Sequence, residues 1–174
     1  RSEDMPGKTA LRRGDKTIDF QALATDVRCA AGGFIDLGLR PGDRIGVYLN
    51  KRIEAVVSYF AAGYAGGVFV PINQTLKPAQ VAHILRDCDI KVLVTTAAQA
   101  AQLLDELEQC PALSAIVTLE PLADKSNLPE RLDSRCWQNI SAGEYELRAP
   151  IRRIESDIAA ILYTSGSTGK PKGV

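Results

Sequence analysis

The sequence predicts an α/β fold with a largely parallel sheet. Between residues 44 and 119, short apolar segments typical of strands alternate with longer segments whose apolar residues recur at helical spacing. This alternation is typical of parallel sheets whose successive strands are joined by helices. Of the 174 residues, 45% are hydrophobic, which suits an ordinary globular core, and no internal repeat interrupts the pattern.

The first long helix is predicted directly after a polar N-terminal region that contains a short strand near Ala10–Arg12. Asp19 occupies a favourable N-cap position, and Gly38 suits the position just after the helix end. Gly32 and Gly33 weaken the interior of this helix. Its apolar positions repeat at helical spacing: Phe20, Leu23, Ala24, Val27, Ala31, Phe34 and Ile35.

The following region supplies the strands of the expected sheet. We predict them at Arg44–Leu49, Val68–Ile72, Ile90–Thr95 and Ser114–Leu119. Three helices are expected to connect them. Asn50 is the expected N-cap of the first helix, and Pro78 occupies the first position of the second. Thr96 is the expected N-cap of the third helix, which runs to about Gln109. His83 lies off the apolar face of the second helix, so we expect a solvated surface histidine.

Residues 120–157 carry little structural information, because they are polar, mixed in charge and interrupted by prolines. Within them, Trp137–Ile140 is interpreted as a short ordered element that fills a gap. The apolar run Ile158–Leu162 then predicts another buried strand.

The stretch Tyr163–Val174 has a composition suited to binding phosphate. Gly166 and Gly169 allow the backbone to approach a ligand closely, and successive N–H groups in such a loop can surround an anion. Hydroxyl groups and two lysines accompany these glycines. The Walker A pattern does not fit, because its first glycine falls on Thr164 and its serine or threonine falls on Pro171.

Composition excludes several other classes of function. Lys and Arg together number 21, as do Asp and Glu, so no overall positive charge favours nucleic acid. The four cysteines form no Cys-x-x-Cys pair and there is a single histidine, which disfavours a zinc site and suggests free thiols in a reducing cytoplasm. No segment approaches the ~20 apolar residues of a membrane span, and no signal peptide is visible.

The segment Tyr163–Val174 (YTSGSTGKPKGV) resembles the phosphate-loop signature of the adenylate-forming enzymes, which include acyl-CoA synthetases, luciferases and adenylation domains of nonribosomal peptide synthetases. Ala61–Ile72 (AAGYAGGVFVPI) resembles a second, structural signature of that family. The resemblance covers nearly the whole chain. It implies that residues 1–174 are the incomplete N-terminal part of the large AMP-binding domain, with the rest of that domain and a small C-terminal domain following.

The resemblance also implies a two-step reaction. ATP and a small carboxylic acid give an acyl-adenylate, and a thiol, often that of coenzyme A, then accepts the acyl group. The phosphates would be held by Thr164, Ser165, Gly166, Ser167, Thr168, Gly169, Lys170 and Lys172. Among these, Lys172 is the expected cation and Lys170 lies at the solvated edge. The ligand for Mg²⁺ and the catalytic residues are expected beyond this chain.

Three functional hypotheses remain open. Residues 72–78 (INQTLKP) favour an AMP-forming acyl-CoA ligase. An amino-acid-activating adenylation domain of a nonribosomal peptide synthetase is the alternative within the family. The third hypothesis is a non-catalytic α/β binding domain with an anion-binding loop.

Overall fold

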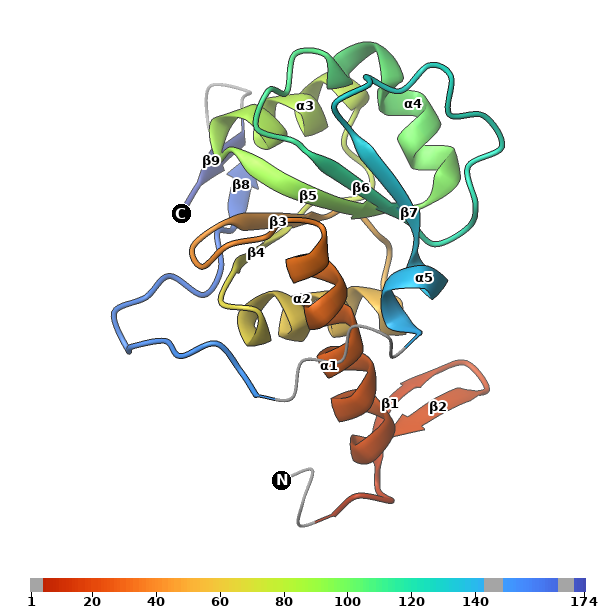
Figure 1. Ribbon diagram of the computed structural model, residues 1–174, viewed down its shortest axis with the longest axis vertical. Coiled ribbons are helices and arrows are strands. Elements are labelled where there is room, and N and C mark those ends of the chain that lie inside the picture. Colours follow the sequence, from red (N-terminus) through yellow and green to blue (C-terminus); the bar gives the residue numbers. More distant parts are fainter. Residues whose placement is uncertain (1–4, 143–148, 166–170) are drawn as a thin grey trace.

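The computed structural model describes residues 5–142, 149–165 and 171–174, and its centre is a five-stranded parallel sheet (Figure 1). The strand order is β4-β3-β5-β6-β7, so the chain first extends the sheet to one side of β3 and then to the other. The predicted α/β class with a parallel sheet is confirmed. The strands are β3 (Arg44–Val47), β4 (Val68–Pro71), β5 (Ile90–Thr95), β6 (Ala115–Thr118) and β7 (Asp133–Cys136).

Helices cover both faces of this sheet. One face packs against α1 (Phe20–Asp36), α2 (Ile53–Tyr64) and α5 (Trp137–Ser141), and the other packs against α3 (Pro78–Asp87) and α4 (Ala97–Leu107) (Figure 1). Alternate residues of β5 point into the two cores, since Val92 and Val94 belong to the first and Leu93 to the second. Burial on both faces explains why these strands are continuously apolar. No helix among the described residues has the length and apolar character needed to cross a membrane.

Local sequence signals place most of the helix ends. Asp19 Oδ1 accepts a hydrogen bond from Ala22 N at 2.7 Å, and Thr96 Oγ1 accepts one from Gln99 N at 3.2 Å, as predicted for N-caps. Gly38, with φ +86°, follows the end of α1 in the left-handed region that glycine favours. The predicted cap at Asn50 is wrong, because α2 begins two residues later and its N-cap, Arg52, makes no side-chain capping bond.

The N-terminal strand prediction is confirmed and extended. β1 (Thr9–Arg13) pairs antiparallel with β2 (Lys16–Asp19), which the sequence did not predict. The two strands form a hairpin beside the start of α1 (Figure 1).

The poorly informative region 120–157 contains the fifth strand of the sheet. β7 pairs parallel with β6, and α5 follows it directly. The predicted ordered element at Trp137–Ile140 is confirmed, and Ile140 is fully buried against α1. A Cβ atom at Gly33 would lie 2.6 Å from Ile140 Cβ, so the glycine that weakens the helix interior permits this close approach.

The expectation of a buried strand at Ile158–Leu162 is wrong. The segment makes one isolated parallel bridge, between Ala160 and Phe69 of the edge strand β4, and the side chains of Ile158 and Leu162 are 60% and 53% exposed. Its backbone is fixed by two bonds, from Phe69 N to Ala159 O at 3.2 Å and from Ile161 N to Phe69 O at 3.1 Å. In the described residues it therefore lies along the sheet edge without being enclosed.

Candidate functional site

The candidate site is built on a short C-terminal hairpin. β8 (Tyr163–Ser165) pairs antiparallel with β9 (Pro171–Gly173), and the register places Thr164 opposite Lys172. Leu162 and Val174 extend the ladder with two reciprocal backbone bonds of 2.9 Å. Directly opposed residues of a ladder lie on the same face, so this hairpin presents a hydroxyl and a cation side by side.

A cleft of about 770 Å³ lies between this hairpin and the carboxyl ends of β3 and β4. Ligands of open α/β sheets bind in a crevice at the carboxyl ends of the strands. The residues after β3 and β4 form one wall, α3 contributes a second, and the hairpin contributes a third. The lining includes Asn50, Lys51, Tyr59, Asn73, Gln74, Gln80, Ile84, Leu162, Tyr163, Thr164 and Pro171.

Hydrogen bonds fix the cleft wall that follows β3. Tyr48 is buried, and its hydroxyl donates to Leu76 O at 3.2 Å, which ties the end of β3 to the segment after β4. Thr95 Oγ1 donates to Tyr48 O at 3.1 Å and links the same position to β5. The wall therefore rests on three adjacent strands, which gives a ligand a rigid boundary.

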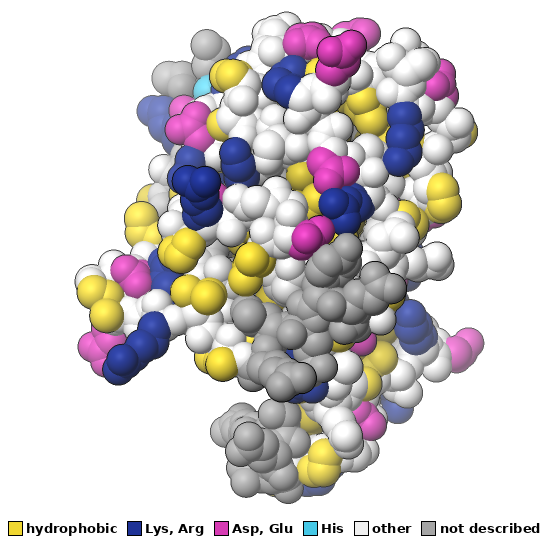
Figure 2. All heavy atoms as spheres, in the orientation of Figure 1, with side chains coloured by type: hydrophobic (Ala, Val, Ile, Leu, Met, Phe, Trp, Pro, Cys, Tyr) yellow, Lys and Arg dark blue, Asp and Glu magenta, His cyan; other side chains and the backbone are white. Residues whose placement is uncertain are grey.

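The hairpin contacts α3 through two side chains of that helix. The Tyr163 hydroxyl donates to Asp87 Oδ2 at 2.5 Å, and His83 Nε2 lies 3.1 Å from Pro171 O. The expectation of a solvated His83 is therefore wrong, because its ring is half-buried and bonded to the hairpin backbone. Figure 2 shows positive and negative side chains interspersed over this face of the molecule.

Burial raises the pKa of Tyr163 well above its usual range, and the bond to Asp87 adds to the effect. The hydroxyl is therefore protonated at neutral pH and acts as a donor. Burial also raises the pKa of the neighbouring Cys88 thiol. That thiol donates to Ile84 O at 3.2 Å, as a structural cysteine does.

The structure places three of the eight predicted phosphate ligands. Thr164 lines the cleft, Lys172 is exposed opposite it, and Ser165 ends β8. Gly166, Ser167, Thr168, Gly169 and Lys170 lie outside the described residues.

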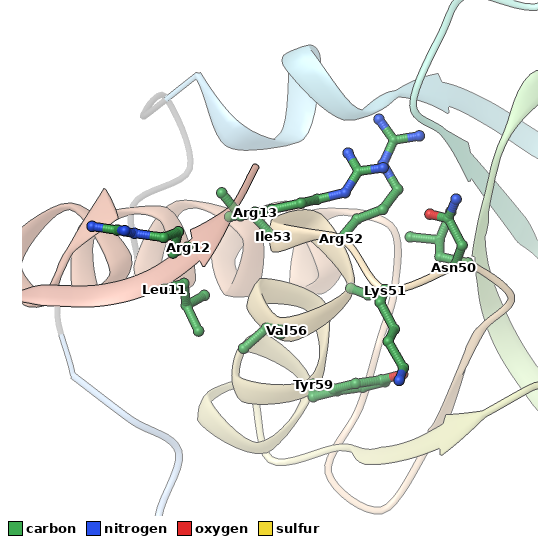
Figure 3. Close-up of a pocket in the computed structure, with 11 residues that line it drawn as sticks. Leu11, Arg12, Arg13, Asn50, Lys51, Arg52, Ile53, Val56 and Tyr59 are labelled. Atoms are coloured by element: carbon green, nitrogen blue, oxygen red, sulfur yellow. The ribbon is translucent and has the colours of Figure 1, made fainter. Parts of the chain in front are cut away.

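A second hollow, of about 350 Å³, lies between β1 and the start of α2 (Figure 3). It shares Leu49, Asn50, Lys51 and Tyr59 with the cleft. Lys51 extends toward the hydroxyl end of Tyr59, whereas Arg12 lies along β1. Arg52 at its rim is already paired, with Glu54 at 3.4 Å and Glu120 at 3.9 Å. None of the described residues predicted to bind phosphate lines this hollow.

The profile of a known family, described as AMP-binding enzyme, matches residues 1–174. The chain belongs to the AMP-binding enzyme family. The predicted relationship to adenylate-forming enzymes is thereby confirmed, and the relatives include both acyl-CoA ligases and enzymes that load carrier proteins.

Two curated relatives represent these branches of the AMP-binding family. The long-chain-fatty-acid–CoA ligase FadD15 of Mycobacterium bovis is 34% identical over 152 residues, which cover 86% of this chain and 24% of the relative. The L-proline–[L-prolyl-carrier protein] ligase of Streptomyces coelicolor is 32% identical over 161 residues, which cover 92% of this chain and 30% of the relative. The chain thus spans less than a third of the length of either protein.

Two solved structures share the fold of this AMP-binding chain. The anthranilate CoA ligase AuaEII in complex with anthranoyl-AMP superimposes with a TM-score of 0.87 at 26% identity, over 98% of this chain and 32% of that one. ATP-bound MatB from Rhodopseudomonas palustris gives a TM-score of 0.73 at 30% identity, over 91% of this chain and 29% of that one.

The described residues around the cleft suit phosphate groups better than a divalent cation. Thr164 offers a hydroxyl donor at the cleft, and Lys172, opposite it in the ladder, offers a positive charge. Donors and cations are the groups that bind phosphate oxygens. Among the described residues, no group of three His, Cys, Asp or Glu side chains could hold a metal ion.

Sequence reasoning missed the two contacts on α3. Their partners are separated by 76 and 88 residues, so no local pattern pairs them. One signal was available, since His83 and Asp87 are four residues apart and therefore share a helix face.

Proposed function

We propose that this chain belongs to an ATP-dependent, AMP-forming acyl-CoA ligase and supplies the part that holds the ATP phosphates. The observation that carries the proposal is the pairing of Thr164 with Lys172 on a hairpin at the carboxyl end of the sheet. Family membership supports the use of ATP and a carboxylic acid. The 34% identity to a fatty-acid–CoA ligase supports coenzyme A as the acceptor.

In the first step, a carboxylate oxygen of the acid attacks the α-phosphorus of ATP. The bond from that phosphorus to the bridging oxygen breaks, and its electron pair leaves with pyrophosphate. We infer that Thr164 and Lys172 stabilise this departing charge with a donor and a cation, and Ser165 belongs to the same proposed set. Such stabilisation is the main source of catalysis in these reactions. Gly166, Ser167, Thr168 and Gly169 complete the proposed set, with Lys170 at its edge.

In the second step, a thiolate attacks the carbonyl carbon of the acyl-adenylate, and the bond to the phosphate oxygen breaks to release AMP. We assign none of the described residues to this step. A cytoplasmic location agrees with four free cysteines, two of which are buried.

One alternative has a specific observation behind it. The 32% identity to a ligase that loads proline onto a carrier protein favours an amino acid as substrate and a carrier-protein thiol as acceptor. Both alternatives use the same adenylation step, so the phosphate-binding role proposed here is common to them.

The test is ATP–pyrophosphate exchange by the protein extended to its natural stop codon. The substrates are a panel of fatty, aromatic and amino acids. We expect exchange that depends on one class of acid, followed by release of AMP when coenzyme A is added. Exchange with amino acids alone would favour the carrier-protein alternative. A folded protein that supports no exchange with any acid would overturn the proposal.

A further inference from the structure

Helix α3 holds both strands of the hairpin from one of its faces. His83 and Asp87 are separated by one helical turn, so their side chains project in the same direction. His83 contacts Pro171 at the start of β9, and Asp87 contacts Tyr163 at the start of β8. The helix therefore contacts each strand separately.

The chemistry of the two contacts is fixed by their acceptors. A backbone carbonyl can only accept, so His83 Nε2 must carry the proton that it shares with Pro171 O. The Tyr163 hydroxyl donates to a carboxylate oxygen, and bonds to ionised groups are stronger than neutral ones. Each contact is a directed hydrogen bond, which fixes position more closely than apolar packing would.

The two contacts lie directly beside Thr164 and Lys172, the pair of residues that is proposed to hold phosphate. Tyr163 immediately precedes Thr164, and Pro171 immediately precedes Lys172. Successive strand residues point to opposite faces, so a Tyr163 ring directed at α3 turns Thr164 away from the helix. Thr164 lines the cleft together with Tyr163 and Pro171, and Lys172 lies opposite Thr164 in the ladder.

Gly173 reinforces this arrangement. It lies opposite Tyr163 in the ladder, and a Cβ atom there would lie 3.2 Å from the tyrosine ring. The absence of a side chain lets the ring pack across the strand and reach Asp87 without being displaced. The tyrosine is thus constrained by its bond to the helix and by its contact with the hairpin.

We propose that His83 and Asp87 are positioning residues, which hold β8 and β9 on α3 so that Thr164 and Lys172 face the nucleotide phosphates. The inference rests on the proposed function, since it assigns a purpose to the hairpin only if the hairpin binds ATP. Neither residue touches the reacting atoms. Their loss should weaken ATP binding and leave the affinity for the acid unchanged.

The test compares variants of the full-length protein in ATP–pyrophosphate exchange. We expect His83→Ala and Asp87→Ala each to raise the KM for ATP about three- to tenfold, the range for one lost hydrogen bond, with the KM for the acid unchanged. His83→Gln retains a donor and Asp87→Asn retains an acceptor, so both should recover most of the loss. Arg86→Ala is the matched control, because Arg86 lies on the same helix and bonds to Gln109 instead.

Limited trypsin digestion provides a readout that is independent of activity. Trypsin can cut after Lys172, whereas the bond after Lys170 is protected by the following proline. Cleavage after Lys172 should be faster in the two alanine variants than in Arg86→Ala. If Asp87→Ala fails to fold, Tyr163→Phe removes only the hydroxyl and tests the same bond.

The possible failures can be told apart. No exchange by the folded wild-type protein would overturn the proposed function. In an active protein, wild-type ATP KM values and wild-type trypsin cleavage in the alanine variants would overturn the positioning role. Equal increases in the KM for ATP and for the acid, without rescue by His83→Gln, would also overturn it, because they would indicate a general structural defect.

Discussion

The central sheet and the C-terminal hairpin are positioned by different kinds of interaction. Strands β3, β5 and β6 are buried on both faces, and Ile45, Leu93 and Ile116 are fully inaccessible. The hairpin is held by two polar contacts with α3, by a short ladder of its own and by the partly buried ring of Tyr163, and most of its other described side chains are exposed. Apolar burial therefore fixes the platform, and directional hydrogen bonds fix the element that is proposed to meet the substrate.

This difference in stabilising interactions suits a rigid sheet and a hairpin that is proposed to bind substrate. A core held by close packing tolerates little movement, whereas a surface element held by a few bonds can be adjusted without unfolding the domain. Changes in the sheet should therefore be read out in stability. Changes in the hairpin should be read out in nucleotide binding and rate.

The largest expected effect is on stability and comes from the sheet. Leu93→Ala should lower the free energy of unfolding by about 2–5 kcal/mol, because it removes a fully buried side chain and leaves a cavity. Leu162→Ala is the matched control beside the hairpin, where the leucine is 53% exposed, and should cost less than about 1 kcal/mol. Urea denaturation followed by circular dichroism measures both. Equal losses in the two variants would contradict the contrast between the regions.

A smaller effect is expected where α1 meets α5. Gly33→Ala adds a Cβ atom at 2.6 Å from Ile140 Cβ, so it should destabilise the protein by about 1–3 kcal/mol despite the better helix propensity of alanine. Gly63→Ala is the matched control inside α2, where a Cβ atom would meet nothing within 4 Å, so it should be neutral or slightly stabilising. Equal midpoints of thermal unfolding for the two alanine variants would show that Ile140 leaves room for a side chain at position 33.

The smallest effect concerns the pH dependence of stability. Burial raises the pKa of the Cys88 and Cys110 thiols above the ordinary value of 9.0. The folded state holds these protons more tightly, so their contribution is complete below pH 9 and is lost as the pH rises through the higher folded pKa values. Cys110→Ala should therefore flatten the decline in the free energy of unfolding above pH 9. An unchanged slope would contradict the buried-thiol account.

The sequence was informative where short-range chemistry decides the structure. The alternation of apolar strands with helical segments correctly predicted the parallel sheet. Asp19, Thr96 and Pro78 correctly indicated where helices begin. Asn50 failed as a cap because the chain continues past β3 before α2 begins, which no local preference reveals.

Long-range pairing could not be predicted. β7 is polar in sequence, with Asp133 and Arg135 in it, and it is a strand because β6 offers an open edge. The apolar run Ile158–Leu162 would suit a core, yet it lies along the edge of β4. In the candidate site, Thr164 and Lys172 came from the motif, whereas His83 and Asp87 depend on contacts across more than 70 residues.

The most direct measurement of the central claim is the adenylation rate of Lys172→Ala in the full-length protein, compared with Lys16→Ala, which removes an exposed lysine from β2. Losing one charge-assisted contact to phosphate costs about 1.5–3 kcal/mol. We therefore expect pyrophosphate exchange by Lys172→Ala to be at least tenfold slower, with unchanged stability, and Lys16→Ala to keep the wild-type rate. Wild-type exchange by Lys172→Ala would contradict the claim that this hairpin holds the phosphates of ATP.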